Sequence, residues 1–362
     1  MSIFKKIGFL AYFIIPTLVI VGFYMGGWAT FSAFLFAYGF VPLLDELVGR
    51  DSENVQESEI EALSKECYFE NILHVLVYFQ LGIILWAGYV VTFYSLSAWE
   101  WVGFTLSLMT NSSGMINVAH ELGHKKTAFA RFQSKLALLT VCYMHFYIEH
   151  NRGHHVRVAT PEDPATSRKG QTFYAFWWQS VIGGFLSAWH LEKSRLQKRN
   201  LPFWSLKHNE MLRFILFPLL FVSLTTLIFS LWRESFAWEW LVLFFVQSLL
   251  AFSSLEAVNY IEHYGMVRKK ISENRYERVN PLHSWNSNHL VSNLFLFQLQ
   301  RHSDHHAYAS HPYQILRHWE ESPQLPFGYP VMILMSLVPP LWFRVMDKRL
   351  EQWQAKQNIS TP

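Results

Sequence analysis

The chain has 362 residues, of which 51% are hydrophobic and 17% are aromatic, while only 16% are charged. About a quarter of the residues of a soluble domain are charged, so this composition excludes an ordinary soluble protein and indicates a membrane protein. The formal net charge is only +3, and we expect the lipid bilayer, and not a nucleic acid, to be the large partner of the chain.

Six apolar stretches approach the ~20 residues that a helix needs to cross a bilayer. They lie at residues 8–25, 28–48, 71–94, 99–120, 211–231 and 237–260. No small-residue cleavage site follows the first stretch, so we expect it to be retained and not removed as a signal peptide. The predicted fold class is all-α: a polytopic membrane protein with six transmembrane helices and a histidine-rich helical region, in a single domain of residues 1–362.

The positive charges predict the orientation of these helices. Lys5 and Lys6 precede the first stretch, which places both termini of a six-helix protein in the cytoplasm. The turns on the far side are then residues 26–27, 95–98 and 232–236, and Arg233 is the single Lys or Arg residue in them. The cytoplasmic parts are residues 120–210 and 261–362. Their shorter apolar stretches, at residues 136–147, 173–188 and 327–343, predict helices at the membrane surface.

Nine histidines gather in four clusters beside the apolar stretches. The clusters are His120 and His124; His150, His154 and His155; His263; and His302, His305 and His306. Neutral imidazole is the commonest protein ligand for transition metals, and nine rings suit two metal ions better than one. A metal pair at a membrane edge indicates redox chemistry on a lipid-soluble substrate. The two cysteines, Cys67 and Cys142, have no paired spacing and predict neither a disulfide framework nor thiolate ligands.

The first cluster continues a polar stripe. His120 and His124 are four residues apart and therefore share one face of a helix. The same face continues through Asn117, Ser113 and Thr110. A polar stripe on an apolar helix is costly in lipid, so we expect this face to contact protein or a cavity.

The second and fourth clusters contain adjacent histidines. His150 and His154 are expected on one helical face, with His155 turned by about 100° from His154, so that one helix could serve two ions. His302, His305 and His306 fall on one flank of a helix. Adjacent histidines are rare in a protein core because each ring needs a polar partner, and two such pairs favour a metal site.

Polar residues that could contact the free ring nitrogens of the ligands accompany the clusters. Glu256 and Asn259 share a helical face with His263, and an ionisable residue inside a membrane helix usually marks a site. The full set of candidates is Glu121, Glu149, Glu256, Asn259, Glu262 and Asp304. Because neighbours on a helix point in different directions, we expect a carboxylate beside one cluster to serve a histidine of another cluster.

The spacing of the histidines leaves the metal and the reaction open. The run from His120 to His124 reads HELGH, which also fits an intramembrane zinc protease, although one zinc site would leave seven clustered histidines without a role. A histidine relay for metal transport is a further alternative, but it predicts histidines spread through the membrane helices. Two iron ions with five or six ligands each suit the all-nitrogen set better than zinc.

Four strings of the sequence resemble those of a known family. They are HELGHK at residues 120–125, EHNRGHH at 149–155, NYIEHYG at 259–265 and LQRHSDHHA at 299–307. These strings look like the boxes of the integral-membrane alkane 1-monooxygenases of bacteria, and the resemblance covers nearly the whole chain. The general pattern of histidine boxes is shared with membrane fatty-acid desaturases and hydroxylases, which are the nearest alternative.

The resemblance implies a non-haem di-iron enzyme that uses O2 to hydroxylate the terminal methyl group of medium-chain n-alkanes, giving 1-alkanols. The nine clustered histidines are then the iron ligands, with no catalytic residue beyond them and no haem or flavin in this chain. Electrons are implied to come from rubredoxin and its NADH-dependent reductase. The implied location is the bacterial inner membrane, with the metal site on the cytoplasmic side.

Two further expectations concern the surroundings of the site. An apolar substrate channel should rise beside the polar faces of the fourth and sixth stretches. The basic runs at residues 193–199 and 268–270 fit contacts with lipid headgroups, and a dock for an acidic electron carrier is the alternative interpretation.

Overall fold

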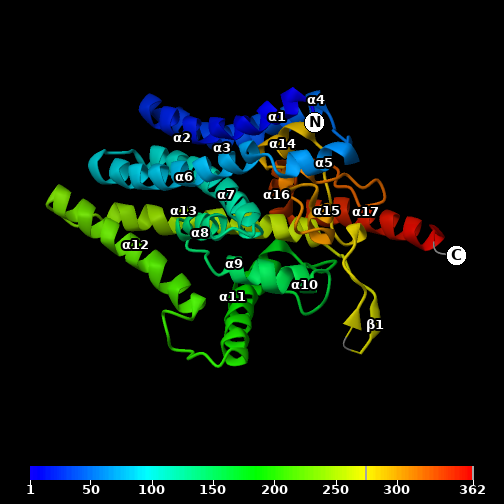
Figure 1. Ribbon diagram of the computed structural model, residues 1–362. Helices are drawn as coiled ribbons and strands as arrows, with labels where there is room; N and C mark the ends of the chain where they lie inside the picture. The colour runs from blue at the N-terminus through cyan, green and yellow to red at the C-terminus, as the bar shows by residue number, and fades with distance from the viewer. Residues whose placement is uncertain (274, 361–362) are drawn as a thin grey trace.

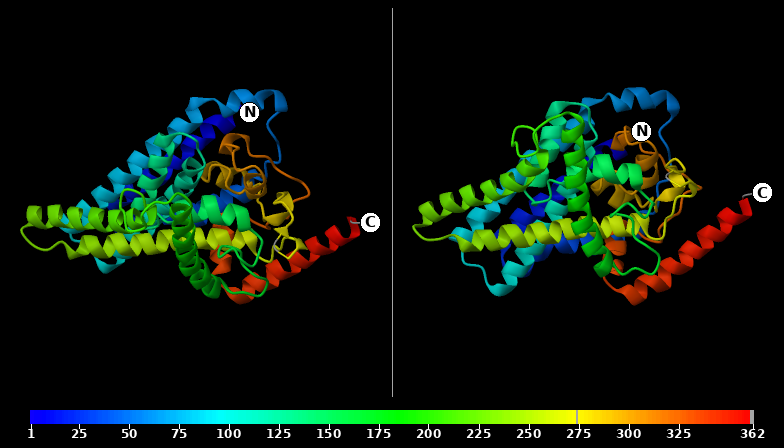
Figure 2. Two further views of the ribbon diagram at one scale, coloured as in Figure 1. Left: turned by 60° about the horizontal axis from the view of Figure 1, so that its bottom comes forward. Right: turned by 90° about the horizontal axis from the view of Figure 1, so that it is seen from below.

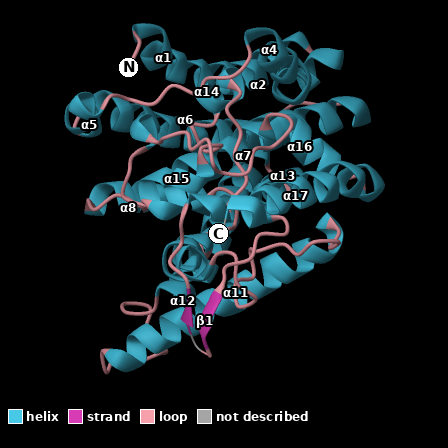
Figure 3. Ribbon diagram, turned by 90° about the vertical axis from the view of Figure 1, so that its right-hand side faces the viewer, coloured by secondary structure: helices cyan, strands magenta, loops and turns pink. Residues whose placement is uncertain are grey.

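The computed structural model describes residues 1–273 and 275–360, with side chains described up to residue 357. The chain is built from helices. In the described part of the chain, the strands are β1 (Lys270–Ser272) and β2 (Arg275–Tyr276). They pair as one antiparallel hairpin, shown in Figure 3. The predicted all-α class is therefore confirmed. The predicted domain of residues 1–362 includes residues 274, 361 and 362, which lie outside the described part.

Five helical segments of the described chain are long and apolar enough to cross a membrane: Ile3–Met25, Gly27–Val48, Cys67–Phe93, Glu210–Arg233 and Trp238–His263. The first contains α1 (Ile3–Gly8), η1 (Phe9–Phe13) and α2 (Ile14–Met25); the second contains η2 (Gly27–Phe31), α3 (Ser32–Leu35), η3 (Phe36–Phe40) and α4 (Val41–Val48). The other three are α6 (Cys67–Phe93), α12 (Glu210–Arg233) and α13 (Trp238–His263), which extend to the left in Figure 1. These segments identify a multi-pass membrane protein.

The fourth predicted stretch lies in α7 (Ala98–Gly123), which is 26 residues long but more polar than the other five segments. This helix is the centre of the bundle and packs against α2, α3, α6, α8 (Ala128–Leu139) and α13. Its polar side chains face these neighbours: Asn111 donates to the Gln80 side chain at 2.6 Å, and Asn117 donates to the carbonyl of Leu296 at 2.6 Å. In the predicted polar stripe, Asn117 therefore contacts protein, and Thr110, Ser113 and Asn117 line a cavity, as expected.

The remaining helices gather around one end of the bundle. They are α5 (Glu57–Ser64), α9 (Phe146–Ile148), η4 (Glu149–His154), α10 (His155–Arg157), α11 (Phe173–Lys198), η5 (Pro281–His283), α14 (Leu290–Phe295), α15 (His302–Ala307), η6 (Tyr313–Ile315), α16 (Tyr329–Ser336) and α17 (Pro339–Ser360). The three shorter apolar stretches lie in α8 and α9, in α11, and in α16 with the start of α17. Both termini lie at this end (Figure 1), and α17 projects away from the bundle (Figure 2).

Tight turns join the opposite ends of the membrane helices. Gly26 (φ 68°) and Gly27 (φ 54°) take left-handed backbone conformations that suit glycine, and so reverse the chain between α2 and η2. The N–H of Gly27 donates to Glu100 at 2.8 Å, and Glu100 also forms a capping box with Ser97 at the start of α7. One carboxylate thus connects the first two turns at this end.

Gly88 allows α6 to pack closely against α12 and α13. A Cβ atom added at Gly88 would lie 2.6 Å from Phe229 and 2.8 Å from Trp240, whereas one added at Gly82 of the same helix would meet nothing within 4 Å. We expect Gly88→Ala to lower the thermal midpoint because overpacking costs about 1–3 kcal/mol. Gly82→Ala should leave it nearly unchanged. Scanning fluorimetry of the detergent-purified variants measures both midpoints, and equal midpoints would contradict this packing.

Candidate metal centre

Two of the long helices, α7 and α13, end in histidines. His120 lies in the last turn of α7, and His124 caps the C-terminus of the same helix. The ring centroids of the two are 4.9 Å apart, so they share one face as predicted. His263 is the last residue of α13 and is fully buried. The ends of α7 and α13 therefore supply three rings to one region.

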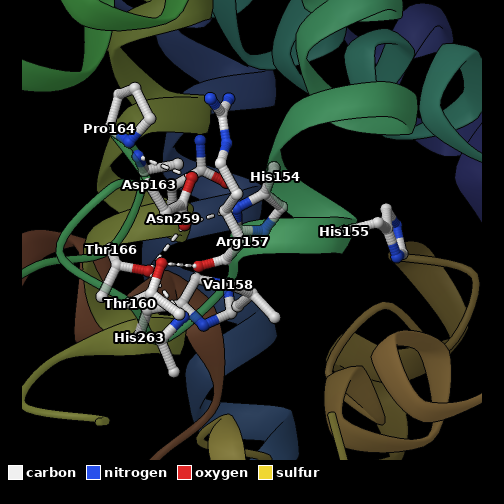
Figure 4. Close-up of polar contacts among 12 residues, drawn as sticks. His154, His155, Arg157, Val158, Thr160, Asp163, Pro164, Thr166, Asn259 and His263 are labelled. Carbon is white, nitrogen blue, oxygen red and sulfur yellow. Dashed lines mark hydrogen bonds and ion pairs between the residues drawn. The ribbon is translucent and has the colours of Figure 1, made fainter. Parts of the chain in front are cut away.

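The second cluster lies on a π-helical turn, η4, which continues into α10. The N–H of His155 donates to the carbonyl of His150, five residues earlier, and this wider turn aligns His150 with His155. Figure 4 shows the rings of His154 and His155 diverging from the chain. The ring centroids of His150 and His154 are 5.4 Å apart, which agrees with the predicted shared face, but Nε2 of His154 lies 3.2 Å from that of His306, so the two rings have different partners.

Gly153 has no side chain, and this leaves room beside the π-turn for the side chains of Arg157 and Glu149. A Cβ atom there would lie 2.4 Å from the Arg157 guanidinium and 2.5 Å from the Glu149 carboxylate. Arg157 Nη2 and Glu149 Oε1 form an ion pair of 2.6 Å that crosses the turn beside Gly153. A side chain at this position would therefore displace the ion pair that braces the histidine-bearing turn.

The fourth cluster divides in the same way. On α15, His302 and His306 are four residues apart, and their Nε2 atoms are 2.8 Å apart. His305 turns instead toward His120 and His155, with Nε2–Nε2 distances of 2.9 and 3.1 Å. Both short segments thus contribute rings to two separate groups, as the sequence predicted for the second cluster.

All nine clustered histidines meet in two groups. The first contains His120, His124, His150, His155 and His305, and the second contains His154, His263, His302 and His306. Within each group, one nitrogen of every ring lies within 4.8 Å of the corresponding nitrogens of the others. The structure therefore brings together every histidine that the sequence selected, and it divides them five to four.

Hydrogen bonding cannot satisfy these nitrogens. In the first group the Nε2 atoms form a chain of four contacts, from His120 to His305, His155, His150 and His124, at 2.9–3.1 Å. A neutral imidazole nitrogen either donates one hydrogen or accepts one, so five nitrogens can form two hydrogen bonds at most. At least two of the four contacts therefore have no hydrogen atom between the two nitrogens. Converging lone pairs of this kind need a cation between them.

The spacing of the nitrogens fits a transition metal. Ligand nitrogens about 2.1 Å from an ion, and at right angles to one another around it, lie about 3.0 Å apart. In the second group, His306 Nε2 lies 3.2 Å from His154 Nε2 and 2.8 Å from His302 Nε2. The buried Nε2 of His263 has no hydrogen-bond partner among the described residues. Each group can therefore hold one ion with four or five nitrogen ligands.

Burial keeps the rings outside the membrane helices in the neutral form that binds metals. Loss of solvation lowers the pKa of His124 to about 3, with a further contribution from Lys125. The same cause lowers the pKa well below its ordinary value for His150, His155, His302, His305 and His306. These rings therefore present free lone pairs at neutral pH and do not lose affinity to protonation.

Among the six polar candidates near the clusters, Glu262 is the one that bonds a clustered histidine. Its Oε2 lies 3.1 Å from Nε2 of His302, and its Oε1 accepts the Tyr329 hydroxyl at 2.8 Å. His302 belongs to a different cluster, as predicted. However, Glu262 meets the nitrogen that points into the group, whereas the prediction placed it at the free nitrogen on the far side of the ring.

The other five candidates have different partners. Glu121 pairs with Lys125, and Glu149 pairs with Arg157. Glu256 accepts from Tyr143 and from Asn259. Asp304 binds His311, Arg317 and Trp319. These side chains brace the segments that carry the histidines, so being next to a cluster in the sequence is a poor guide to which ring a carboxylate contacts.

Asp163 is the supporting carboxylate that the sequence did not reveal. Its Oδ2 lies 2.9 Å from Nδ1 of His154 and also accepts the Thr166 hydroxyl at 2.6 Å, as Figure 4 shows. The side chain is fully buried. A carboxylate at Nδ1 fixes the tautomer, so that Nε2 of His154 carries the lone pair that faces the group. Asp163 lies in the loop before α11, where no spacing relative to His154 indicates a contact.

Comparison with known proteins agrees with this architecture. The fatty acid desaturase family model matches residues 97–335. Alkane 1-monooxygenase 2 of Pseudomonas aeruginosa is 44% identical over 325 residues, covering 88% of this chain and 83% of that protein. The chain belongs to the alkane 1-monooxygenase family. Alkane 1-monooxygenases of Pseudomonas putida (43% over 330 residues, 90% and 80% covered) and Alcanivorax borkumensis (40% over 359 residues, 96% and 92% covered) are similar in the same way.

Membership of the alkane 1-monooxygenase family confirms the resemblance that the four histidine strings predicted. It also identifies the chain as an oxidoreductase. The matched region of the desaturase model begins at the start of α7 and ends in α16, so it contains both histidine groups. The family and the geometry therefore point to the same part of the molecule.

Asp163→Asn tests the support of His154. The amide keeps the shape of the side chain but removes the charge that orients the ring, so we expect metal affinity to fall about 10- to 100-fold in the four-histidine group. The five-histidine group should keep its ion. Asp45→Asn is the matched control, because Asp45 is equally buried but accepts from the N–H of Ser292 and bonds no histidine of either group. Metal titration followed by elemental analysis reports both, and equal losses in the two variants would contradict this role.

Proposed function

We propose that this protein uses O2 to hydroxylate the terminal methyl group of medium-chain n-alkanes to 1-alkanols at a non-haem di-iron site. The names of its relatives suggest the substrate and the reaction. The single observation that carries the proposal is an uncharged, mainly apolar cavity of about 100 Å³ that reaches the neighbourhood of the two histidine groups. Apolar walls with a few polar groups are typical of small-molecule sites.

The cavity suits a substrate without a polar end. It is lined by residues of η1, α2, η3, α4, α7, α13, α14 and α16 and of the loop after α14, with no Lys, Arg, Asp or Glu among them. Its polar groups already have protein partners: Tyr12 donates to the carbonyl of Asn111, Thr110 to that of Leu106, and Ser113 to that of Met109. An alkane placed here would leave few polar atoms unsatisfied.

Two residues of the cavity wall approach the histidines. Asn117 lies one helical turn before His120 on α7, and Tyr329 donates its hydroxyl to Glu262, which contacts His302. A chain end at this wall would lie beside both groups. Holding the methyl group there lowers the entropic part of the barrier, because the reacting bond no longer has to be found by diffusion.

The residues present fit two iron ions. His120, His124, His150, His155 and His305 would hold one, and His154, His263, His302 and His306 the other. Bound iron would supply the dioxygen activation and hydrogen-atom abstraction that a terminal C–H bond requires and that no side chain provides. The chain's own residues keep the rings neutral, orient His154 through Asp163, and exclude water through burial.

The alternatives fit less well. A fatty-acid desaturase or hydroxylase shares the histidine pattern, but the uncharged cavity offers no cation for a carboxylate head group. A zinc protease would need Glu121 of the HELGH run as its base, and that carboxylate is held by Lys125 at 2.8 Å and by the N–H of Tyr313. Metal transport is disfavoured because the histidines gather at helix ends and do not form a path.

We also propose the remaining elements of the sequence prediction. Residues 1–362 form a single integral-membrane domain, α7 crosses the membrane as a sixth helix, and both termini lie in the cytoplasm of a bacterial inner membrane together with residues 120–210 and 261–362. The termini and the histidine groups lie at the same end of the bundle, which supports this orientation (Figure 1). Rubredoxin and its NADH-dependent reductase are the proposed electron donors.

Turnover by the purified protein tests the proposal. With iron, octane and reduced rubredoxin, we expect 1-octanol as the product and two iron ions per chain. His154→Ala and His305→Ala, one from each group, should each reduce iron to about one per chain and abolish turnover. His190→Ala, an exposed residue of α11, is the control and should retain both. Zinc in an active protein, or normal iron in both ligand variants, would contradict the proposal.

The basic run at residues 268–270 supplies a candidate dock for the donor. Arg268 is buried and donates to the carbonyls of Val156 and Val158. These bonds anchor the chain just before the β-hairpin to the histidine-bearing α10 and to the residue that follows it. Lys269 and Lys270 remain exposed. In the other run, Arg195 is held by Glu192. The hairpin therefore presents positive charge close to the metal groups.

Charge reversal at Lys270 tests this dock. Lys270→Glu should lower rubredoxin-driven turnover about fivefold at low salt, because steering of an acidic partner depends on surface charge. The difference should shrink as salt shortens the screening length. Lys193→Glu, in the other run, should have no effect, and a small chemical reductant should drive all three proteins equally. A loss that persists with the chemical reductant would exclude docking as its cause.

A further inference from the structure

A second cavity system lies on the opposite side of α13 from the uncharged cavity. Its inner part is small, about 20 Å³, and is lined by His150 and His154, one from each group, and by Glu149, Glu256 and Asn259. Its outer part, of about 470 Å³, is a groove between α11, α12 and α13. Tyr143 and His145 line both parts and separate them.

The two parts differ in polarity. The groove is lined mainly by apolar side chains such as Val181, Ile182, Phe185, Ile215 and Leu219. Ile182 and Leu219 are about half exposed, so the groove is open at the surface that faces lipid. The inner part contains two carboxylates and an amide beside the histidines. The system therefore runs from an apolar surface to a polar interior.

One atom of the inner part has an unmet hydrogen-bonding capacity. Glu149 is more than nine-tenths buried, and Arg157 satisfies its Oε1 at 2.6 Å. Its Oε2 forms no hydrogen bond with a described residue, although the Ser187 hydroxyl lies near the carboxylate. A buried acceptor without a partner costs about 1–3 kcal/mol. A ligand that brings one O–H donor to this point would recover that free energy, whereas an alkane would not.

We propose that this system binds a primary alcohol, with its hydroxyl donating to Glu149 Oε2 and its alkyl tail in the groove between α11, α12 and α13. This inference rests on the proposed function, which makes such an alcohol the product. The substrate then occupies the uncharged cavity on one side of α13, and the product leaves toward lipid on the other side. The tail passes between the rings of Tyr143 and His145, which contact each other at a centroid distance of 4.4 Å.

The contacts of Tyr143 and His145, the two residues between the inner part and the groove, show which of them can move more easily. Tyr143 stacks on Phe252 at 4.6 Å and donates to Glu256 at 2.7 Å, while His145 packs edge-on against Phe185 at 5.3 Å. His145 makes no hydrogen bond through its ring within the described residues, so its rotation breaks none. A tail can therefore displace His145 at less cost than it could displace Tyr143.

Photolabelling tests the site without turnover. The full chain in nanodiscs is irradiated with a 1-octanol analogue that carries a diazirine on its chain, and with the matching octane analogue. We expect the alcohol to label α11, α12 or α13 at the groove, with competition by 1-octanol. The octane analogue should label the cavity beside α7. Equal labelling of the groove by both analogues would show a general apolar surface for lipid chains and would overturn the proposal.

Leu219→Trp and Leu220→Trp form a matched pair of variants. The two residues are neighbours on α12 with exposed fractions of 48% and 45%, but Leu219 alone of the two lines the groove. Leu219→Trp should reduce groove labelling by the alcohol roughly tenfold, the loss expected when about two methylene groups are denied burial. Leu220→Trp should not change it. Identical labelling in both variants would also overturn the proposal.

Octane turnover separates this inference from the proposed function. If the protein forms 1-octanol but the alcohol analogue labels only the cavity beside α7, the product site is wrong and the enzyme assignment stands. If the analogue labels the groove selectively but octane is never hydroxylated, the alcohol site stands and the assigned reaction is wrong.

Discussion

The structure depends on holding eight imidazole rings closer together than hydrogen bonding between them can explain. Six Nε2–Nε2 contacts of 2.8–3.2 Å bring lone pairs together in a buried space. Nitrogen atoms can be held this close, ready to surround a cation, only if the backbone segments that carry the rings are rigid. The two long helices α7 and α13 provide that rigidity, and the short segments η4 and α15 are braced by ion pairs of Glu149 and Asp304.

Rigid support is unevenly distributed between the two groups. The four-histidine group has Asp163 behind His154 and Glu262 beside His302, whereas no carboxylate bonds a ring of the five-histidine group within the described residues. The four-histidine group therefore has two buried carboxyl groups at its rings, which the other group lacks in the described part of the chain. The two ions would therefore sit in different electrostatic surroundings, even though both groups consist of imidazoles.

Sequence patterns predicted the features that depend on residue composition and residue type. They failed where the local backbone conformation decides which side chains meet. The apolar stretches and the nine histidines could be found because lipid and metals each demand particular residue types. The pairing of His150 with His155 could not be predicted, because the sequence of a π-helical turn looks like that of an α-helix. Asp163 was missed because only the fold of the loop before α11 brings it to His154. Glu121 and Asp304 misled, since neighbours in sequence point to different partners.

The uncharged cavity lies only partly where the sequence predicted a substrate channel. The channel was expected beside the polar faces of both α7 and α13, and the α7 face with Thr110 and Asn117 does line the uncharged cavity. On α13, however, that cavity meets Leu255 and Val258, while Glu256 and Asn259 line the polar cavity on the other side. Successive residues of a helix are turned by about 100°, so one helix can present an apolar wall to one space and a polar wall to another. In this way α13 separates a space suited to an alkane from one suited to an alcohol.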